Sequence, residues 1–121
     1  MATPNLINVD TITPVVGVGA VGTSRTTAVD VTDEYCAKIN SLIIANIDGT
    51  NAADITVEVS VDNGSNYVKI ANTISVPADS SLSLIGKDNG FYLDETDILA
   101  VTASADSDLT YLVSYEEMKD A

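Results

Sequence analysis

The sequence contains no histidine and no tryptophan, and cysteine occurs once, at Cys36. Histidine is the commonest general base and zinc ligand, so its absence excludes Ser-His-Asp and Cys-His catalysis and a zinc site of the usual kind. A single cysteine also excludes an internal disulfide. We expect Cys36, which lies beside an apolar run, to be a buried small residue. The sequence therefore predicts that the chain is not an enzyme and needs no cofactor or metal.

Basic residues are also scarce, since five lysines and arginines stand against 18 acidic residues for a net charge of −13. This balance excludes direct binding to a nucleic-acid backbone. It fits a basic or neutral partner, and equally a protein that stays soluble at high copy number. The chain has no apolar run of 18 residues and no basic, signal-like N-terminus, so we expect no membrane contact and synthesis in the cytoplasm.

Carboxylates are the remaining chemical groups, and they cluster in two stretches, "LDETD" (93–97) and "ADSD" (105–108). Such clusters could form a calcium site or a glycosidase pair. Short acidic clusters are also ordinary in turns between strands, and this is the interpretation we favour. The stretch "GVGAVG" (17–22) matches a phosphate-binding pattern in letters but has no βαβ context around it.

The first 25 residues differ from the rest because Pro4, Pro14 and three glycines interrupt short apolar stretches. The pattern predicts no element longer than a few residues. Its apolar content is too high for a solvated tail, so it should lie on its own domain or on a neighbouring chain. We therefore expect an extended N-terminal arm (1–25) followed by one domain (26–121). The arm residues expected to contact a partner are Leu6, Ile7, Val9, Ile12, Val15 and Val16.

From residue 26 onward the sequence consists of short alternating apolar runs separated by turns, which is typical of strands. The spacing predicts an all-β fold, an antiparallel β-sandwich that is jelly-roll-like, with about eight short strands. The length suffices for one core. The expected strands cover 26–32, 36–47, 54–62, 67–76, 80–85, 91–93, 97–104 and 109–116.

Three of these segments carry further expectations. Segment 36–47 has apolar residues at both odd and even positions, so we expect a central strand covered on both faces. Segment 54–62 alternates cleanly, which predicts one core face and one solvent face. In 109–116, Leu109, Tyr111, Val113 and Tyr115 share a face. The aromatic residues beside turns, Tyr67, Phe91 and Tyr92, are the better candidates for contact with another chain.

Five stretches carry a resemblance. They are "PNLINVDTIT" (4–13), "KINSLIIANIDGTNAADITVEV" (38–59), "IANTISVPADSSL" (70–82), "FYLDETDILAVTASADSDL" (91–109) and "VSYEEM" (113–118). Together they resemble small virion structural proteins of tailed bacteriophages, especially phages of marine bacteria and cyanobacteria. Where that group often has Glu-Gly-Asp between its last strands, this chain has Glu95-Thr96-Asp97.

The resemblance implies a non-enzymatic particle component, a head decoration (cement) protein on the capsid exterior. Its partners would be the major capsid protein and further copies of itself, with a trimer favoured. A collar or ring component of the neck or tail is the first alternative. A carbohydrate-binding adhesion module is the second, although the chain has no tryptophan to stack on sugars. An enzyme is the weakest choice.

Overall fold

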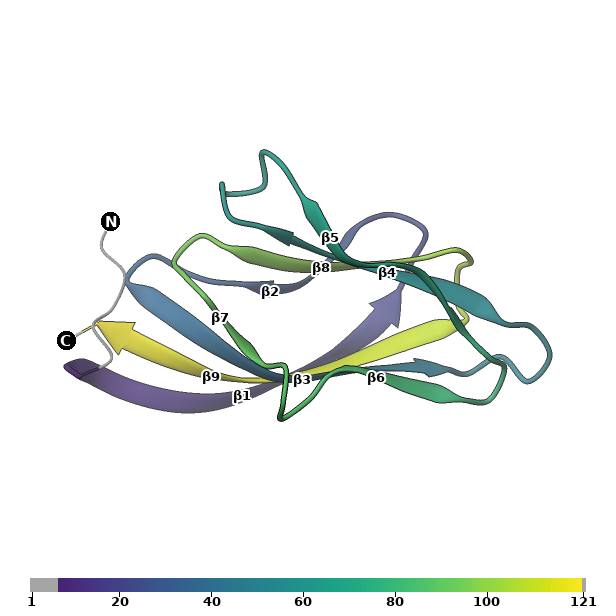
Figure 1. The fold of residues 1–121 in the computed structure, drawn as a ribbon, viewed down its shortest axis with the longest axis horizontal. Helices are drawn as coiled ribbons and strands as arrows, with labels where there is room; N and C mark the ends of the chain where they lie inside the picture. Colours follow the sequence, from purple (N-terminus) through teal and green to yellow (C-terminus); the bar gives the residue numbers. More distant parts are fainter. Residues whose placement is uncertain (1–6, 121) are drawn as a thin grey trace.

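The computed structural model describes residues 7–120, which form two antiparallel sheets packed face to face (Figure 1). The five-stranded sheet has the order β1-β9-β3-β6, with β7 also paired to β3. Its members are β1 (Val9–Val21), β9 (Leu109–Asp120), β3 (Tyr35–Asn46), β6 (Ser81–Ile85) and β7 (Phe91–Leu93). The four-stranded sheet has the order β2-β8-β4-β5. Its members are β2 (Thr26–Asp30), β8 (Ile98–Ala103), β4 (Ala53–Ser60) and β5 (Val68–Val76). The expected all-β antiparallel sandwich is confirmed.

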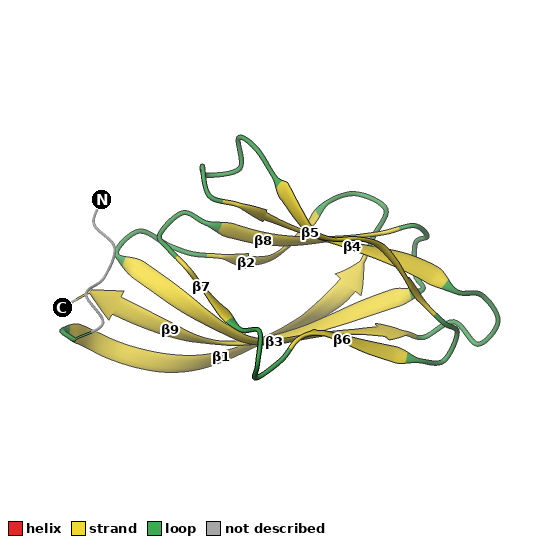
Figure 2. Cartoon of the chain, viewed as in Figure 1, coloured by secondary structure: helices red, strands yellow, loops and turns green. Residues whose placement is uncertain are grey.

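Turns and loops connect all the described strands (Figure 2), and no helix in this part of the chain is long and apolar enough to cross a membrane. The expected strands from residue 26 onward are all present. Seven of them agree with the predicted bounds to within two residues at each end. The last strand, β9, continues to Asp120. Alternating apolar runs thus located the strands well, because each run has one face to bury.

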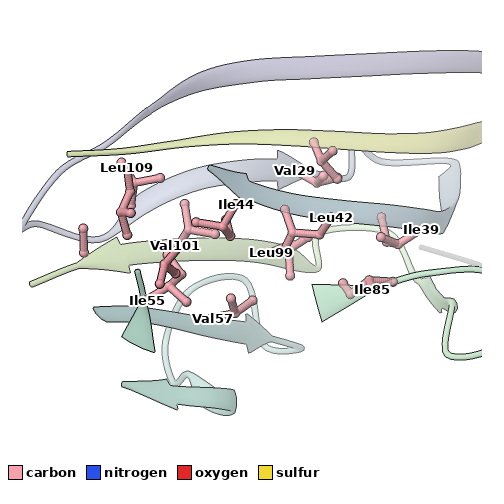
Figure 3. Close-up of a cluster of buried hydrophobic side chains, with 14 of the residues drawn as sticks. Val29, Ile39, Leu42, Ile44, Ile55, Val57, Ile85, Leu99, Val101 and Leu109 are labelled. Carbon is pink, nitrogen blue, oxygen red and sulfur yellow. The ribbon is translucent and has the colours of Figure 1, made fainter. Parts of the chain in front are cut away.

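The core lies between the two sheets and consists mainly of aliphatic side chains. In Figure 3, Leu42 and Ile44 of β3 point into the same space as Leu99 and Val101 of β8. All four are fully buried. Ile55 and Val57 of β4 are buried, as predicted for the core face of segment 54–62, whereas Val61 lies beyond the end of the strand and is 72% exposed. Leu109 and Val113 are also buried, while Tyr111 and Tyr115 pack against the core as expected for one face of β9.

The first strand, β1, corrects the expectation that residues 1–25 contain no long element. It is 13 residues long and pairs with β9 in an unbroken antiparallel register from Thr11 to Val21. Proline is tolerated here because β1 is the outermost strand of its sheet, where a nitrogen that faces away from the neighbouring strand needs no hydrogen. The described part of the expected arm, residues 7–25, therefore adds its main element to the sandwich. Leu6 lies outside the described residues.

The expectation that β3 is covered on both faces is also wrong. β3 is an inner strand between β9 and β6, as predicted. Its register shifts between Ile39 and Ser41, so the parity of its side chains changes along the strand. This bulge explains why apolar residues occur at both odd and even positions. Leu42 and Ile44 face the core, whereas Ile43 is 37% exposed on the opposite face.

The turn before β8 keeps a left-handed residue although the resembling proteins often have glycine there. Thr96 has a φ of 64°, which is unfavourable for a β-branched residue. The turn is held by hydrogen bonds from the Thr96 amide to the Val31 carbonyl and from the Asp94 amide to the Asp97 carboxylate. These bonds explain how the chain keeps the turn without glycine.

Candidate interaction surface

On strand β1 large aliphatic side chains point toward solvent, while glycines occupy positions that face the core, where large side chains are usual. Val16 and Val18 point outward and are 64% and 69% exposed. The neighbouring core-facing positions, Gly17 between them and Gly19 after Val18, are glycines. A Cβ at Gly17 would lie 3.2 Å from Cγ1 of Val113, and one at Gly19 only 2.9 Å from Cε2 of Tyr111. The glycines therefore leave room for the Val113 and Tyr111 side chains of the paired strand β9, while the valines stay exposed.

The exposed valines belong to a larger surface across the five-stranded sheet. Val18 lies opposite Leu112 on β9, and Leu112 lies opposite Ile43 on β3, so three aliphatic side chains form one outward row. The rows on either side contain small or hydroxyl residues. We call this surface the uncharged face, and its residues are Val16, Val18, Ala20, Ser41, Ile43, Ala45, Ser81, Ser83, Thr110, Leu112 and Ser114. None of them carries a charge, in a chain with 18 acidic residues.

The uncharged face is a shallow surface with a defined limit. It contains a depression of about 460 Å³, lined by Val18, Gly19, Ile43, Ala45, Thr110, Tyr111 and Leu112. Toward the chain termini it ends at the row in which Glu116 lies opposite Lys38 and Pro14. The Glu116 carboxylate accepts a hydrogen bond from Nδ2 of Asn40, 3.3 Å away. The shape suits a broad protein contact better than a small ligand, which needs a concave pocket.

The outer face of the four-stranded sheet carries a charged pair, Arg25 and Glu58, whose members hydrogen-bond to each other. The Arg25 guanidinium donates two hydrogen bonds to the Glu58 carboxylate, at 3.1 and 3.2 Å, and its carbon lies 3.8 Å from the centre of the Tyr67 ring. The bond to Glu58 raises the pKa of Arg25. The sequence predicts that Glu58 faces solvent. In the structure it is only 7% exposed and is paired with Arg25, so this prediction is wrong. Tyr67 is half-buried and has one ring face covered by Arg25.

The other two aromatic residues expected at a contact line a separate hollow. It has a volume of about 300 Å³, and its lining residues are Val59, Val61, Val68, Ile70, Phe91, Tyr92, Leu93 and Asp97. Tyr92 is 53% exposed, whereas Phe91 packs partly against the core. Burial raises the pKa of Asp97 in this hollow. Phe91 and Tyr92 thus line one hollow, and Tyr67 is not among its lining residues.

Of the expected arm residues, Val9, Ile12, Val15 and Val16 lie on β1, and Ile7 lies two residues before it. Ile7 is 95% and Ile12 57% exposed, while Val9 and Val15 are half-buried. Only Val16 of this set belongs to the uncharged face. Val18, Ile43 and Leu112, which form the apolar row of this face, are outside the set expected from the sequence. The alternation of "VVGVGA" carries the signal for Val18, and the second parity of 36–47 carries the signal for Ile43.

The acidic clusters behave as turn residues. Asp97 accepts a hydrogen bond from the Asp94 amide, and Asp106 accepts one from the Thr23 amide, at 2.8 and 2.9 Å. Within residues 7–120, no three histidine, cysteine, aspartate or glutamate side chains are grouped so that they could hold a metal ion. Cys36 is buried, as predicted, and burial raises the pKa of its thiol.

No protein-family model and no curated protein matches this chain. Among solved structures, the chain is similar to one described as "Bacillus endospore appendages form a novel family of disulfide-linked pili". Identity is 13% and the TM-score 0.54, over 92% of this chain and 88% of that one. Two structures of a pentameric capsid protein from metagenomic phage sequences each show 17% identity and a TM-score of 0.41. They cover 95% of this chain and 62% or 67% of the other. The first likeness supports the fold alone, and the other two carry no argument.

Proposed function

We propose that this chain is a non-enzymatic structural protein of a tailed-phage virion, a decoration protein that binds the outside of the capsid through its uncharged face. The observation that carries the proposal is strand β1, which exposes Val16 and Val18 while glycines face the core. Together with Leu112 and Ile43, these valines form an apolar surface without charges. Contiguous exposed apolar surfaces of this kind are typical of protein interaction sites.

The sequence resemblance supports the choice of a virion. It covers residues 4–13, 38–59, 70–82, 91–109 and 113–118, so it extends over strands of both sheets. The strand order also supports the jelly-roll part of the expected fold. Most successive strands lie in opposite sheets, and first and last strands are neighbours, as in double-sheet jelly rolls.

Decoration would stabilise a capsid by mass action. A protein that binds only the assembled lattice lowers its free energy by RT ln(1 + [L]/Kd), about 2.7 kcal/mol per site at a hundredfold excess over Kd. The high negative charge would keep many copies soluble and apart on the exterior. The partners would be the major capsid protein and other copies of this chain; the trimer expected from the sequence stays a prediction.

Copy number tests this proposal. Virions are purified from the source of the sequence, and this chain is quantified against the major capsid protein by mass spectrometry. We expect a fixed ratio near one per capsid subunit, or hundreds of copies per particle. A dozen copies or fewer per particle would indicate a neck or tail component instead. Absence from virions would contradict the virion assignment itself.

A further inference from the structure

The outer edge of β1 is a second feature of this strand, distinct from the face. Among the described residues β1 pairs with β9 and with no other strand, so the backbone groups of alternate residues along this 13-residue strand point away from β9. From Thr11 to Ser24 the segment contains no charged residue. A long, uncharged and apolar edge of this kind is a template for pairing with another strand.

The other three sheet edges are protected against such pairing. β2 and β6 have five residues each, and both have register shifts. The pairing of β5 with β4 shifts twice, and β5 contains Lys69 and a left-handed residue, Thr73. Shortness, bulges and charges are the usual means by which proteins block edges. In β1 a charge, Asp10, and a register shift occur only at the start of the strand, and from Thr11 onward Pro14 is the one such feature.

Charge indicates which partner suits this edge. Two copies of the chain each carry a charge of −13, so contacts through most of their surfaces bring like charges together. The β1 edge and the neighbouring uncharged face are where two copies can meet without that cost. A basic partner would instead be attracted to the acidic surfaces. A second β1 also matches the length of the first, which the five-residue edge strands do not.

We propose that β1 pairs antiparallel with β1 of a second copy of this chain, which joins two five-stranded sheets across a two-fold axis. A two-fold contact uses the same strand on both sides and closes, so it does not extend into a fibre. A two-fold axis near Val16 places Pro14 opposite Val18 and Ile12 opposite Ala20 of the partner, so the outward cross-strand pairs are apolar. The uncharged face would then continue across both copies. This pairing gives a dimer in place of the trimer expected from the sequence, and it does not depend on the proposed virion function.

Proline substitution gives a test that is specific for the edge. Pro14 is accommodated because its nitrogen faces away from β9, so the amides of Val16 and Val18, two and four residues on, face the same way. Val18→Pro therefore removes an outward donor and leaves the β9 ladder in place. Val18→Thr is the matched control because it keeps both the amide and the β-branched shape. Leu112→Ser alters the uncharged face without touching the edge.

The mass of the full chain is measured by analytical ultracentrifugation over a range of concentrations. We expect the wild type, Val18→Thr and Leu112→Ser to reach twice the monomer mass, and Val18→Pro to weaken dimerisation by about tenfold or more. A wild type that stays monomeric would overturn the proposal. So would a dimer that Leu112→Ser weakens and Val18→Pro does not, because that pattern indicates contact through the face.

Amide hydrogen exchange of the wild type provides a test that does not depend on how Val18→Pro folds. The amides of Val16 and Val18 should exchange more slowly at high than at low protein concentration, while the β5 edge should not change. Equal exchange at both concentrations, in a range where the mass doubles, would show that the dimer forms elsewhere. A monomer that is nevertheless abundant in virions would contradict this pairing and leave decoration intact. A chain that dimerises but is absent from virions would contradict decoration and leave this pairing intact.

Discussion

The outer faces of the two sheets differ in the side chains that they present to solvent. On the four-stranded sheet, Arg25 donates two hydrogen bonds to Glu58 and stacks on Tyr67, so this charged pair is satisfied within the chain. On the five-stranded sheet, Val18, Leu112 and Ile43 remain exposed beside small and hydroxyl residues. The first face pairs a charge that is largely buried, whereas the second leaves apolar area in water. Burying such area against a partner favours binding, by an amount reduced by the entropy cost of association.

Removing β1 would break this comparison most severely. We expect a chain that lacks residues 1–20 to lose cooperative unfolding, because β9 would become an exposed edge and Tyr111 and Val113 would lose the strand paired beside them. Circular dichroism with thermal melting measures this. A truncated chain with an unchanged melting transition would show that β1 is a detachable arm, as the sequence alone had suggested.

Substitutions on the two sides of β1 should have the next largest effect on stability, and the core-facing side should be the more sensitive. Gly19→Val places side-chain atoms where a Cβ alone would lie 2.9 Å from the Tyr111 ring, so we expect a loss of about 1–3 kcal/mol in unfolding free energy. Val18→Ser, on the outward side, should change stability by less than about 0.5 kcal/mol. Chemical denaturation measures both. Equal effects would mean that the strand is not oriented as described.

On the outer face of the four-stranded sheet, removing one member of the Arg25–Glu58 pair should lower stability more than removing both members. Arg25→Met leaves the Glu58 carboxylate, which is 7% exposed, without its ion pair, and we expect the melting temperature to fall by roughly 2–5 °C. The double variant Arg25→Met/Glu58→Met should recover most of that loss. If the double variant were the less stable of the two, the pair itself would be the stabilising element.

The smallest expected effect is a pH dependence from the acidic turns. Burial raises the pKa of Asp97 above its ordinary value of 3.8, so the folded state binds this proton more readily and stability should increase as the pH falls from neutral toward that value. Hydrogen bonds from Asn66 lower the pKa of Asp62, so its contribution is lost only below the ordinary carboxyl range. Thermal melts across this range should show a maximum on the acidic side. Asp97→Asn should flatten the rise, whereas Asp62→Asn should alter only the most acidic limb.

The sequence predicted the core better than the candidate surface, for a physical reason. Buried faces impose a strict alternation, so segments such as 54–62 are recognisable without a structure. In β1 the glycines looked like interruptions of an arm, although they are the positions where Tyr111 and Val113 approach the backbone. Their role depends on residues about 95 positions away in the chain. Ile43 was misassigned because one bulge in β3 changes which side chains face outward.

The central claim is that the uncharged face binds another protein, and a matched pair of substitutions tests it most directly. Ile43 on this face and Ile74 on β5 are both 37% exposed, so Ile43→Ser and Ile74→Ser remove similar apolar area from different surfaces. Binding of each variant to undecorated capsids is measured by cosedimentation. The account predicts that Ile43→Ser binds about tenfold more weakly or worse, while Ile74→Ser binds like the wild type. Equal binding by the two variants would contradict it.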